Sequence, residues 1–302
     1  MYNGILLLNK EPGFTSHDAV AKLRGILRFR RIGHAGTLDP MAQGLLVMLL
    51  GKATRASEYA SGAEKEYIAD FILGVETDTQ DTTGNVLAEA PVDVTETQLR
   101  QALSSFEGGY DQVPPMYSAI QKDGVRLYDL ARKGKEVERE SRFIALPLLE
   151  LLSFEAPRGK LRVRCSKGTY IRTLCHDLGQ RLGCGGAMSA LTRVQAGDFS
   201  LENALTLGEV EQLTKEGALQ QHILPVDRLF ASLPAVTLTE EGAKRARNGA
   251  HAAQKHLLTG EIPPVDSLCR VYTPEGKFLM TGKGGLLDVG PPAIFCHKIF
   301  GE

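Results

Sequence analysis

A strict alternation of apolar and basic side chains near the middle of the chain constrains the fold more than any other feature of the sequence. Between Lys160 and Cys165 the odd-numbered positions are apolar, whereas Arg162 and Arg164 occupy even-numbered positions. Successive side chains of a strand point to opposite sides, so this segment predicts a strand with one apolar face and one cationic face. The segment 67–73 has a similar period of two and predicts a second strand.

Helical patterns occur in this sequence, but they do not follow every strand. Thr15 or Ser16 can cap a helix that carries apolar residues at helical spacing, and residues 95–106 predict an amphipathic helix. A third helical stripe, after residue 172, ends at Gly183. A doubly wound sheet would need strands and helices in regular alternation. The sequence therefore predicts an α+β fold with a mixed, largely antiparallel sheet and flanking helices.

The length of 302 residues and a change of pattern near Leu233 and Pro234 predict two domains. Beyond this point, short strands are separated by turns rich in glycine and proline, which is typical of a compact, β-rich appendage. We therefore expect a main domain over residues 1–232 and a small C-terminal domain over residues 233–302.

The composition excludes several classes of protein. With 43% hydrophobic and 24% charged residues, the chain is neither disordered nor of low complexity. Its longest uninterrupted apolar run, from Leu45 to Leu50, is too short to span a bilayer, and we expect no secretory leader. The five cysteines are odd in number and lack CxxC spacing, so we expect neither a disulfide framework nor a zinc site. A reduced, cytoplasmic protein fits best.

The net charge of -1 conceals clusters of one sign. Residues 22–31 contain five basic residues and no acid, and residues 158–172 contain six basic residues and no acid. Clustered cations of this kind can bind phosphate whatever the net charge is. Ordinary solvated faces explain the same pattern, and charge alone favours that interpretation.

A glycine-rich loop places a histidine and a carboxylate between the first helix and a buried strand. It runs from Gly33 to Gly44 and contains His34 and Asp39. Loops held by rigid elements often carry function, but an ordinary Asp-Pro turn explains the same residues, so the loop alone decides nothing. Gly51-Lys52 is followed by alanine, which excludes a phosphate-binding loop of the GxxxxGK[ST] type.

Two further segments offer aromatic and basic side chains. Tyr67 begins a strand and, by itself, reads as a core aromatic residue. If residues 170–172 are extended, Tyr170 and Arg172 point the same way and offer a ring and a guanidinium. Such a pair can stack on a base and bind a carboxylate or phosphate, but this segment in isolation favours an exposed, ordinary pair.

Taken together, these segments resemble the TruB-type bacterial tRNA pseudouridine synthases over nearly the whole chain. The resemblance rests on an ordered series of motifs: NKEPGFTSHDAV from Asn9, GHAGTLDPMAQGLL from Gly33, KEYIADFILGVETDTQDTTG from Lys65, PPMYSAIQKDGVRLYDLARKG from Pro114, SKGTYIRTLCHDLGQRLG from Ser166 and ALTRVQAGDF from Ala190. One departure is Glu11, because the family commonly has proline directly after the lysine that matches Lys10. The resemblance implies the pseudouridine synthase fold with a PUA-like RNA-binding domain over residues 233–302.

The family's activity, and therefore the expected one, is isomerisation of the uridine at position 55 in the T-arm of tRNA to pseudouridine. The resemblance implies that tRNA is the partner and that the chemistry needs no cofactor. We further expect no metal, no membrane partner, a cytoplasmic location and a monomer. A basic insertion over about residues 122–142 is expected to close over the RNA loop. A role in tRNA folding that is independent of catalysis is also compatible with the family.

The resemblance also assigns residues. Asp39 matches the essential aspartate, which could attack C1′ or C6 or deprotonate C2′, and Arg172 matches the arginine that pairs with it. The remaining matches contact the substrate: Tyr67 and Tyr170 line the base pocket, Leu191 makes an apolar contact to the flipped base, and His34 helps hold the nucleotide out of the stack. Lys10 and Asp81 also lie in family motifs, where each either touches substrate or braces the pocket.

Two other classes of protein remain open. The pairs His17-Asp18 and His176-Asp177 could belong to a metal-dependent phosphohydrolase, which would need further ligands nearby. A non-catalytic RNA-binding protein could use the same basic surface.

Overall fold

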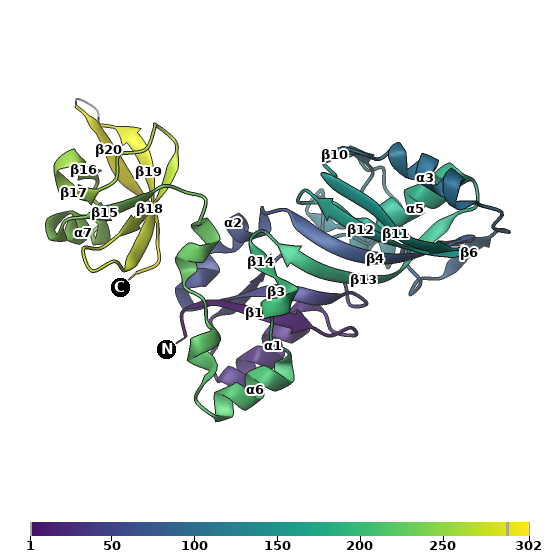
Figure 1. The fold of residues 1–302 in the computed structure, drawn as a ribbon, viewed down its shortest axis with the longest axis horizontal. Coiled ribbons are helices and arrows are strands. Elements are labelled where there is room, and N and C mark those ends of the chain that lie inside the picture. Colours follow the sequence, from purple (N-terminus) through teal and green to yellow (C-terminus); the bar gives the residue numbers. More distant parts are fainter. Residues whose placement is uncertain (1, 288–289, 302) are drawn as a thin grey trace.

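The computed structural model describes residues 2–287 and 290–301, and a sheet of eight strands forms its main body (Figure 1). The strand order is β1-β3-β13-β4-β12-β11, with β2 also paired to β3 and β14 to β13. The bounds are β1 (Gly4–Lys10), β2 (Ile32–Ala35), β3 (Gln43–Leu50), β4 (Lys65–Leu73), β11 (Leu148–Glu155), β12 (Arg158–Cys165), β13 (Gly186–Ala196) and β14 (Phe199–Ser200). Within the described residues, every pairing in this sheet except that of β3 with β13 is antiparallel, which confirms the expected mixed, largely antiparallel sheet.

Helices cover this sheet at both ends. The helices of the main body are α1 (Ser16–Leu27), α2 (Ser57–Ser61), α3 (Glu96–Ser104), α5 (Ile171–Leu182) and α6 (Leu207–Lys215), with short 3-10 turns η1 (Gly51–Ala56), η2 (Leu201–Asn203), η3 (Leu219–His222) and η4 (Val226–Phe230). In Figure 1, α1 and α6 lie near β1 and β3, whereas α3 and α5 lie over the other end. One continuous apolar cluster joins both groups to the sheet. No helix of the described residues is long and apolar enough to cross a membrane.

The first helix begins where the sequence places it. The Thr15 hydroxyl accepts from the Asp18 N–H, and the Asp18 carboxylate accepts from the Thr15 N–H at 2.9 Å. This capping box satisfies two backbone donors that a helix start leaves free. Gly183 ends α5 in the left-handed conformation, at φ +75°, which glycine adopts without strain.

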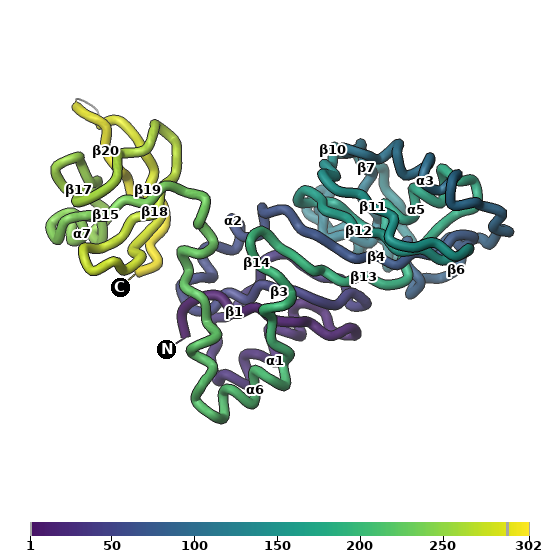
Figure 2. Tube along the Cα trace, in the orientation of Figure 1, coloured from purple at the N-terminus to yellow at the C-terminus, as the bar shows by residue number. Residues whose placement is uncertain are grey.

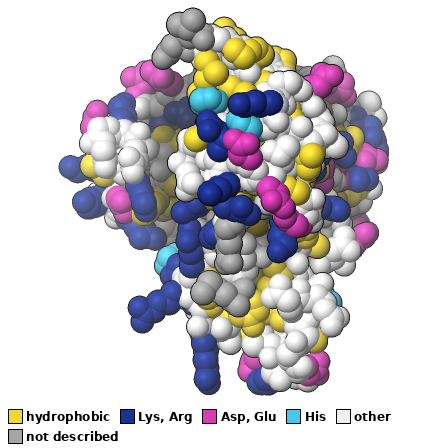
Figure 3. All heavy atoms as spheres, turned by 90° about the vertical axis from the view of Figure 1, so that its left-hand side faces the viewer, with side chains coloured by type: hydrophobic (Ala, Val, Ile, Leu, Met, Phe, Trp, Pro, Cys, Tyr) yellow, Lys and Arg dark blue, Asp and Glu magenta, His cyan; other side chains and the backbone are white. Residues whose placement is uncertain are grey.

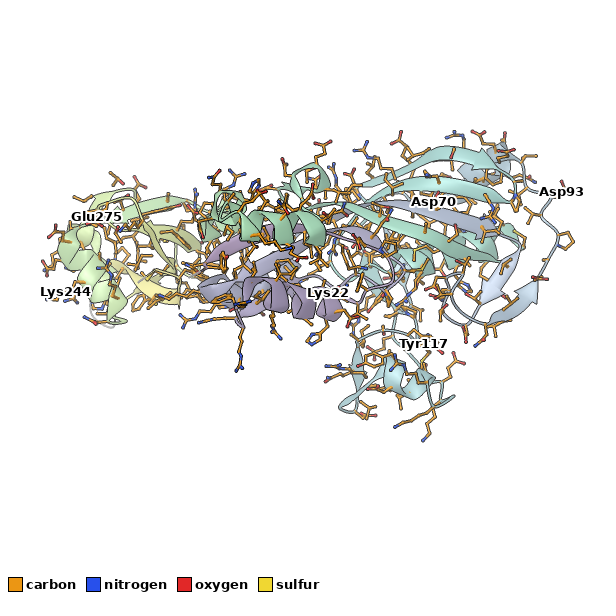
Figure 4. All side chains as sticks on the ribbon, turned by 90° about the horizontal axis from the view of Figure 1, so that it is seen from below. Lys22, Asp70, Asp93, Tyr117, Lys244 and Glu275 are labelled. Atoms are coloured by element: carbon orange, nitrogen blue, oxygen red, sulfur yellow. The ribbon has the colours of Figure 1, made fainter. Side chains whose placement is uncertain are left out.

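The basic face of β12 is paired rather than free. Glu66 of β4 is almost fully buried and accepts from Arg162 at 2.6 Å and from Arg164 at 2.8 Å. Further along the two strands, where Lys160 pairs with Asp70, the Lys160 ammonium lies 3.1 Å from the carboxylate of Asp70, which Figure 4 labels. The alternation predicted the strand correctly, but cross-strand carboxylates neutralise much of its cationic face.

An insertion projects from the body below the sheet, beside the labelled Tyr117 in Figure 4. Its base is the pair of β7 (Tyr110–Gln112) and β10 (Arg142–Ile144), and its outer part holds β8 (Gln121–Lys122), β9 (Val125–Arg126) and α4 (Leu127–Ala131). A separate hairpin of β5 (Val75–Thr77) and β6 (Val86–Glu89) leaves the far end of β4.

The C-terminal segment forms a second sheet, a nearly closed β-barrel with the order β16-β20-β19-β18-β15-β17. Its elements are β15 (Ala235–Leu238), α7 (Glu240–Arg247), β16 (Ala252–Ala253), η5 (Gln254–His256), β17 (Leu257–Thr259), β18 (Leu268–Tyr272), β19 (Phe278–Leu286) and β20 (Pro292–Ile299). It has an apolar cluster of its own, and the expected β-rich, PUA-like appendage is confirmed. Figure 2 follows the chain from β14 through α6 and back up to the barrel.

Aromatic rings join the barrel to the main body. Phe230 of η4 lies 4.6 Å from the Tyr59 ring, 5.9 Å from Phe278 and 5.5 Å from Phe300, measured between ring centroids. Two basic side chains also join the barrel to the main body. Lys52 donates to the Gly301 carbonyl at 2.5 Å, and Arg55 donates to the Ile299 carbonyl at 2.8 Å. Phe230 and Phe300 are buried in one cluster with the underside of the main sheet, so the two parts share a core.

Phe230→Ala should lower the free energy of unfolding by about 3–5 kcal/mol, because it leaves a cavity among packed rings. Urea unfolding of the whole chain measures this loss. Phe143→Ala is the matched control, because Phe143 is 67% exposed; its loss should stay within about 0.5 kcal/mol. Equal losses for both variants would show that the junction contributes little.

Candidate active site

A cavity of about 880 Å³ opens where the loop between β2 and β3 meets β4, β13 and the start of α5. The insertion contributes to one side of it through residues 117–119, Tyr128 and Arg132. Of the residues that the sequence singled out, those that line it are Asp39, Tyr67, Asp81, Tyr170, Arg172 and Leu191. The fold thus gathers six distant positions at one place.

An ion pair occupies the floor of this cavity. Arg172 Nη1 lies 3.3 Å from Asp39 Oδ2 and 3.8 Å from Asp81 Oδ2. The Arg172 side chain is only 8% exposed, whereas that of Asp39 is 35% exposed and therefore accessible from the cavity. Arg172 Nη2 also donates to the carbonyl of Tyr117 at 2.5 Å. The expected Asp39–Arg172 pair is thus present, with Asp81 as a second carboxylate beside it.

Asp81 is held by its own turn. Its Oδ1 accepts from the hydroxyls of Thr79 and Thr83 and from the Thr83 N–H, at 2.5–2.9 Å. These contacts leave Oδ2 directed toward Arg172. The structure therefore places Asp81 as a support of the guanidinium as well as a residue of the cavity wall.

Two aromatic rings and a leucine form the walls. Tyr67 is buried on β4, opposite Arg193 of β13, and burial raises the pKa of its hydroxyl. Tyr170 precedes α5, and its ring centroid lies 5.7 Å from the guanidinium carbon of Arg172. Burial also raises the pKa of Tyr170, so both phenols are neutral near pH 7. Leu191 of β13 adds an apolar surface.

Backbone carbonyls of the loop that carries Asp39 are held by buried donors. Arg193 is 1% exposed and donates to Gly36 at 3.0 Å, to Thr37 at 3.4 Å and to Leu45 at 2.7 Å. Ser16 is buried at the start of α1; its hydroxyl accepts from the Leu38 N–H at 2.8 Å and donates to the Leu38 carbonyl at 3.2 Å. A buried carbonyl without a donor is costly, so these contacts fix the loop in one conformation.

Lys10 reaches the loop from the other side. Its ammonium donates to Glu11 at 2.9 Å, to Phe14 at 2.7 Å and to Pro40 at 3.5 Å, all at carbonyl oxygens, and the residue is 1% exposed. Lys10 is not among the residues that line the cavity. Of the two roles expected for it, this position favours bracing the loop over touching substrate.

His34 lies on β2, paired with Met48, and is also absent from the lining of the cavity. Its Nδ1 is buried without a hydrogen-bond partner in the described part of the chain, and burial lowers its pKa. The structure thus places His34 beside the loop rather than at its tip.

Sequence reasoning missed two buried cations near the loop, Arg193 and Lys65. Arg193 lies in the quoted ALTRVQAGDF motif, two positions after Leu191, and so on the same face of β13. This spacing of two could have indicated that Arg193 lies near the site. Lys65 also lines the cavity; it donates to Ser61 and Ala63, and burial lowers its pKa to about 8.

The two His-Asp pairs serve other contacts. Asp18 caps α1, Asp177 accepts from the Tyr110 hydroxyl at 2.8 Å, and His176 lies 3.8 Å from Glu76. Over residues 2–287 and 290–301, no group of three His, Cys, Asp or Glu side chains is arranged to hold a metal ion.

An open cavity with aromatic walls and a carboxylate paired to arginine on its floor defines the class of pseudouridine synthases. Residues 24–171 match the family model of the TruB family pseudouridylate synthase N-terminal domain, and residues 172–231 match that of the tRNA pseudouridylate synthase B C-terminal domain. The chain belongs to the TruB family.

Relatives and solved structures agree with this assignment. A tRNA pseudouridine synthase B of Pseudomonas aeruginosa is 47% identical over 95% of this chain and 93% of its own length. One of Opitutus terrae is 51% identical over 76% of this chain and 96% of its own length. A Cbf5-Nop10-Gar1 complex contains a chain with a TM-score of 0.76 at 28% identity, covering 98% of this chain and 84% of that one. A structure of an H/ACA ribonucleoprotein bound to a substrate RNA containing 2′-deoxyuridine contains a chain with a TM-score of 0.75 at 26% identity. The match covers 98% of this chain and 84% of that one.

Lys10→Met should change how stability depends on pH. Burial, partly opposed by the nearby Asp39, lowers the pKa of Lys10 from 10.5 to about 8. Between these pH values the unfolded chain binds more protons than the folded protein, so this group makes the free energy of unfolding rise with pH. The free energy of unfolding of wild type, relative to that of Lys10→Met, should therefore increase between about pH 8 and pH 10.5.

Urea unfolding across a pH series measures this difference. Lys133→Met serves as the control, because Lys133 is an exposed lysine on the insertion, and its curve should run parallel to that of wild type. A parallel curve for Lys10→Met as well would contradict the burial of a charged ammonium beside the loop.

Proposed function

We propose that this protein isomerises uridine 55 in the T-arm of tRNA to pseudouridine. The observation that carries the proposal is the Asp39–Arg172 pair at the floor of a cavity walled by Tyr67 and Tyr170. The curated relatives named tRNA pseudouridine synthase B support the substrate and the position. Such relatives are bacterial tRNA enzymes, which supports a cytoplasmic location.

The reaction requires that the N1–C1′ bond breaks, that the base turns and that C5 bonds to C1′. The C5 proton is lost and N1 gains a proton, so the product is an isomer and no electrons are exchanged with another molecule. A stacked base hides these atoms, and the nucleotide must therefore leave the stack and enter a pocket. The cavity is large enough for a nucleotide and is open on one side to receive it.

Asp39 is the proposed catalytic group. Its carboxylate is exposed to the cavity, and the adjacent guanidinium stabilises its negative charge. This geometry suits attack on C1′ or C6 and also deprotonation at C2′. Arg172 orients the carboxylate, and Asp81 in turn orients Arg172.

The walls bind the flipped base. We assign stacking to Tyr67, which supplies about 1–3 kcal/mol per base in comparable contacts, and a second wall to Tyr170. Leu191 excludes water from the opposite side. We also propose that the Tyr67 oxygen receives the C5 proton. A neutral phenol can do this only if its own proton passes to another acceptor, and burial, which raises the pKa of Tyr67, opposes that loss. Lys10 braces the loop through its three carbonyl contacts. The substrate contacts expected for His34 and Lys10 stay predictions.

The insertion and the barrel complete the RNA surface. The insertion carries exposed basic side chains, of which Arg132 lines the cavity: Lys122, Arg126, Arg132, Lys133 and Lys135. We propose that residues 1–232, with this insertion over about 122–142, are the catalytic domain and that residues 233–302 are an RNA-contacting domain. Basic side chains are spread over the barrel end in Figure 3, beside acidic ones. One molecule contains every proposed group, so a monomer suffices.

Position-resolved pseudouridine mapping on an unmodified tRNA transcript tests the proposed function. With the protein and no added cofactor, one modified uridine is expected, in the T-loop. Modification at other positions, or a requirement for a redox cofactor, would contradict the assignment.

Asp39→Asn should abolish turnover and leave tRNA affinity within about threefold of wild type, because phosphate contacts from lysine and arginine dominate binding. Single-turnover assays and filter binding measure the two effects separately. An active Asp39→Asn protein would exclude the carboxylate from catalysis. If the bound tRNA still refolds, a folding role is separable from the chemistry.

Arg172→Lys should lower the single-turnover rate about tenfold, because lysine keeps the charge but lacks the planar fork. Arg172→Met should lower it by about 10²–10³-fold, because two neighbouring carboxylates lose their partner. Equal rates for the two variants would show that the positive charge of residue 172 does not contribute to the rate. Circular dichroism of both proteins checks that the fold is retained.

A further inference from the structure

Gln112 holds the backbone of a pocket residue although it does not line the cavity itself. It ends β7 and is 2% exposed. Its Oε1 accepts from the Tyr170 N–H at 2.8 Å, and its Nε2 donates to the Tyr170 carbonyl at 3.0 Å. The side-chain amide thus pairs with one residue through both backbone groups, as a neighbouring strand would.

A second chain of hydrogen bonds fixes the orientation of this amide. Gln112 Nε2 donates its other proton to the Tyr110 hydroxyl at 2.8 Å, and that hydroxyl donates to Asp177 Oδ2 at 2.8 Å. Asp177 lies on α5, the helix that Tyr170 precedes. Because the carboxylate can only accept from Tyr110, the Tyr110 oxygen must accept from Gln112, and the amide cannot turn over without losing these bonds.

Tyr170, the residue that Gln112 holds, lies in the cavity wall and close to Arg172. Tyr170 contributes a wall of the cavity, and Arg172 follows two residues later in the first turn of α5. No side chain caps the start of α5; instead, Gln112 holds the backbone of the N-cap residue, Tyr170, from another element. The insertion begins immediately after Gln112, at the base formed by β7 and β10.

We propose that Gln112 is a positioning residue for the reaction: it fixes Tyr170 and the start of α5, and through them the place of Arg172 beside Asp39. This inference rests on the proposed function, because its readout is pseudouridine formation. It acts on the rate within the bound complex rather than on RNA affinity, since Gln112 has no surface in the cavity.

Gln112→Glu gives a test with a pH signature. The variant has nearly the same shape, but an ionised carboxylate cannot donate to the Tyr170 carbonyl and would repel it. When protonated, the carboxyl group can again donate to that carbonyl and accept from the Tyr170 N–H, and burial favours the protonated form. The single-turnover rate relative to wild type should be at least about tenfold lower at pH 8 and should recover to within about threefold at pH 6.

Two variants separate this effect from a general loss. Gln112→Met removes every hydrogen bond and cannot titrate, so its rate relative to wild type should be low and independent of pH. Gln101→Glu makes the same chemical change at an exposed position on α3 and should match wild type throughout. Affinity for T-arm RNA, measured alongside, should change less than about threefold for all of them.

A rate ratio for Gln112→Glu that is flat with pH, or a loss confined to RNA affinity, would overturn the inference. If that variant does not fold, Tyr110→Phe decides: it removes only the hydroxyl that orients the amide, and a wild-type rate would refute the positioning role. An inactive wild type would instead refute the proposed function, because these tests compare variants with an active wild type.

Discussion

The buried guanidinium of Arg193 is the contact on which the rest of the site depends. It lies at the one place where β3 and β13 run parallel, and it bonds both to β3, at Leu45, and to the loop, at Gly36 and Thr37. Gly44 faces it with φ +101°, and a side chain there would collide with the Arg193 backbone. The sheet and the loop that carries Asp39 are therefore held together as a single unit.

Local patterns explain how much of this could be read from the sequence. The alternation at 160–165 and the capping residues around Thr15 identify β12 and α1, because both depend on neighbours in the chain. The motifs that carry Asp39 and Arg172 identified the floor of the site through the family resemblance. A search for patterns within segments was sufficient for these features.

Pairings between segments far apart in the chain could not be read in this way. Glu66 pairs with Arg162 and Arg164, which lie almost a hundred residues away in the chain. No local pattern around Glu66 or around the arginines indicates this pairing. The same holds for Gln112, whose role appears only when β7 lies against the start of α5. Lys10 illustrates a different limit: the motif signalled importance, but only the three carbonyls around its ammonium distinguish bracing from binding.

The ring cluster at Phe230 fixes the distance between the barrel and the cavity. Because the barrel shares buried side chains with the underside of the main sheet, the distance from barrel to cavity is set once, during folding. An RNA that touches both must match that span with its own rigid dimensions.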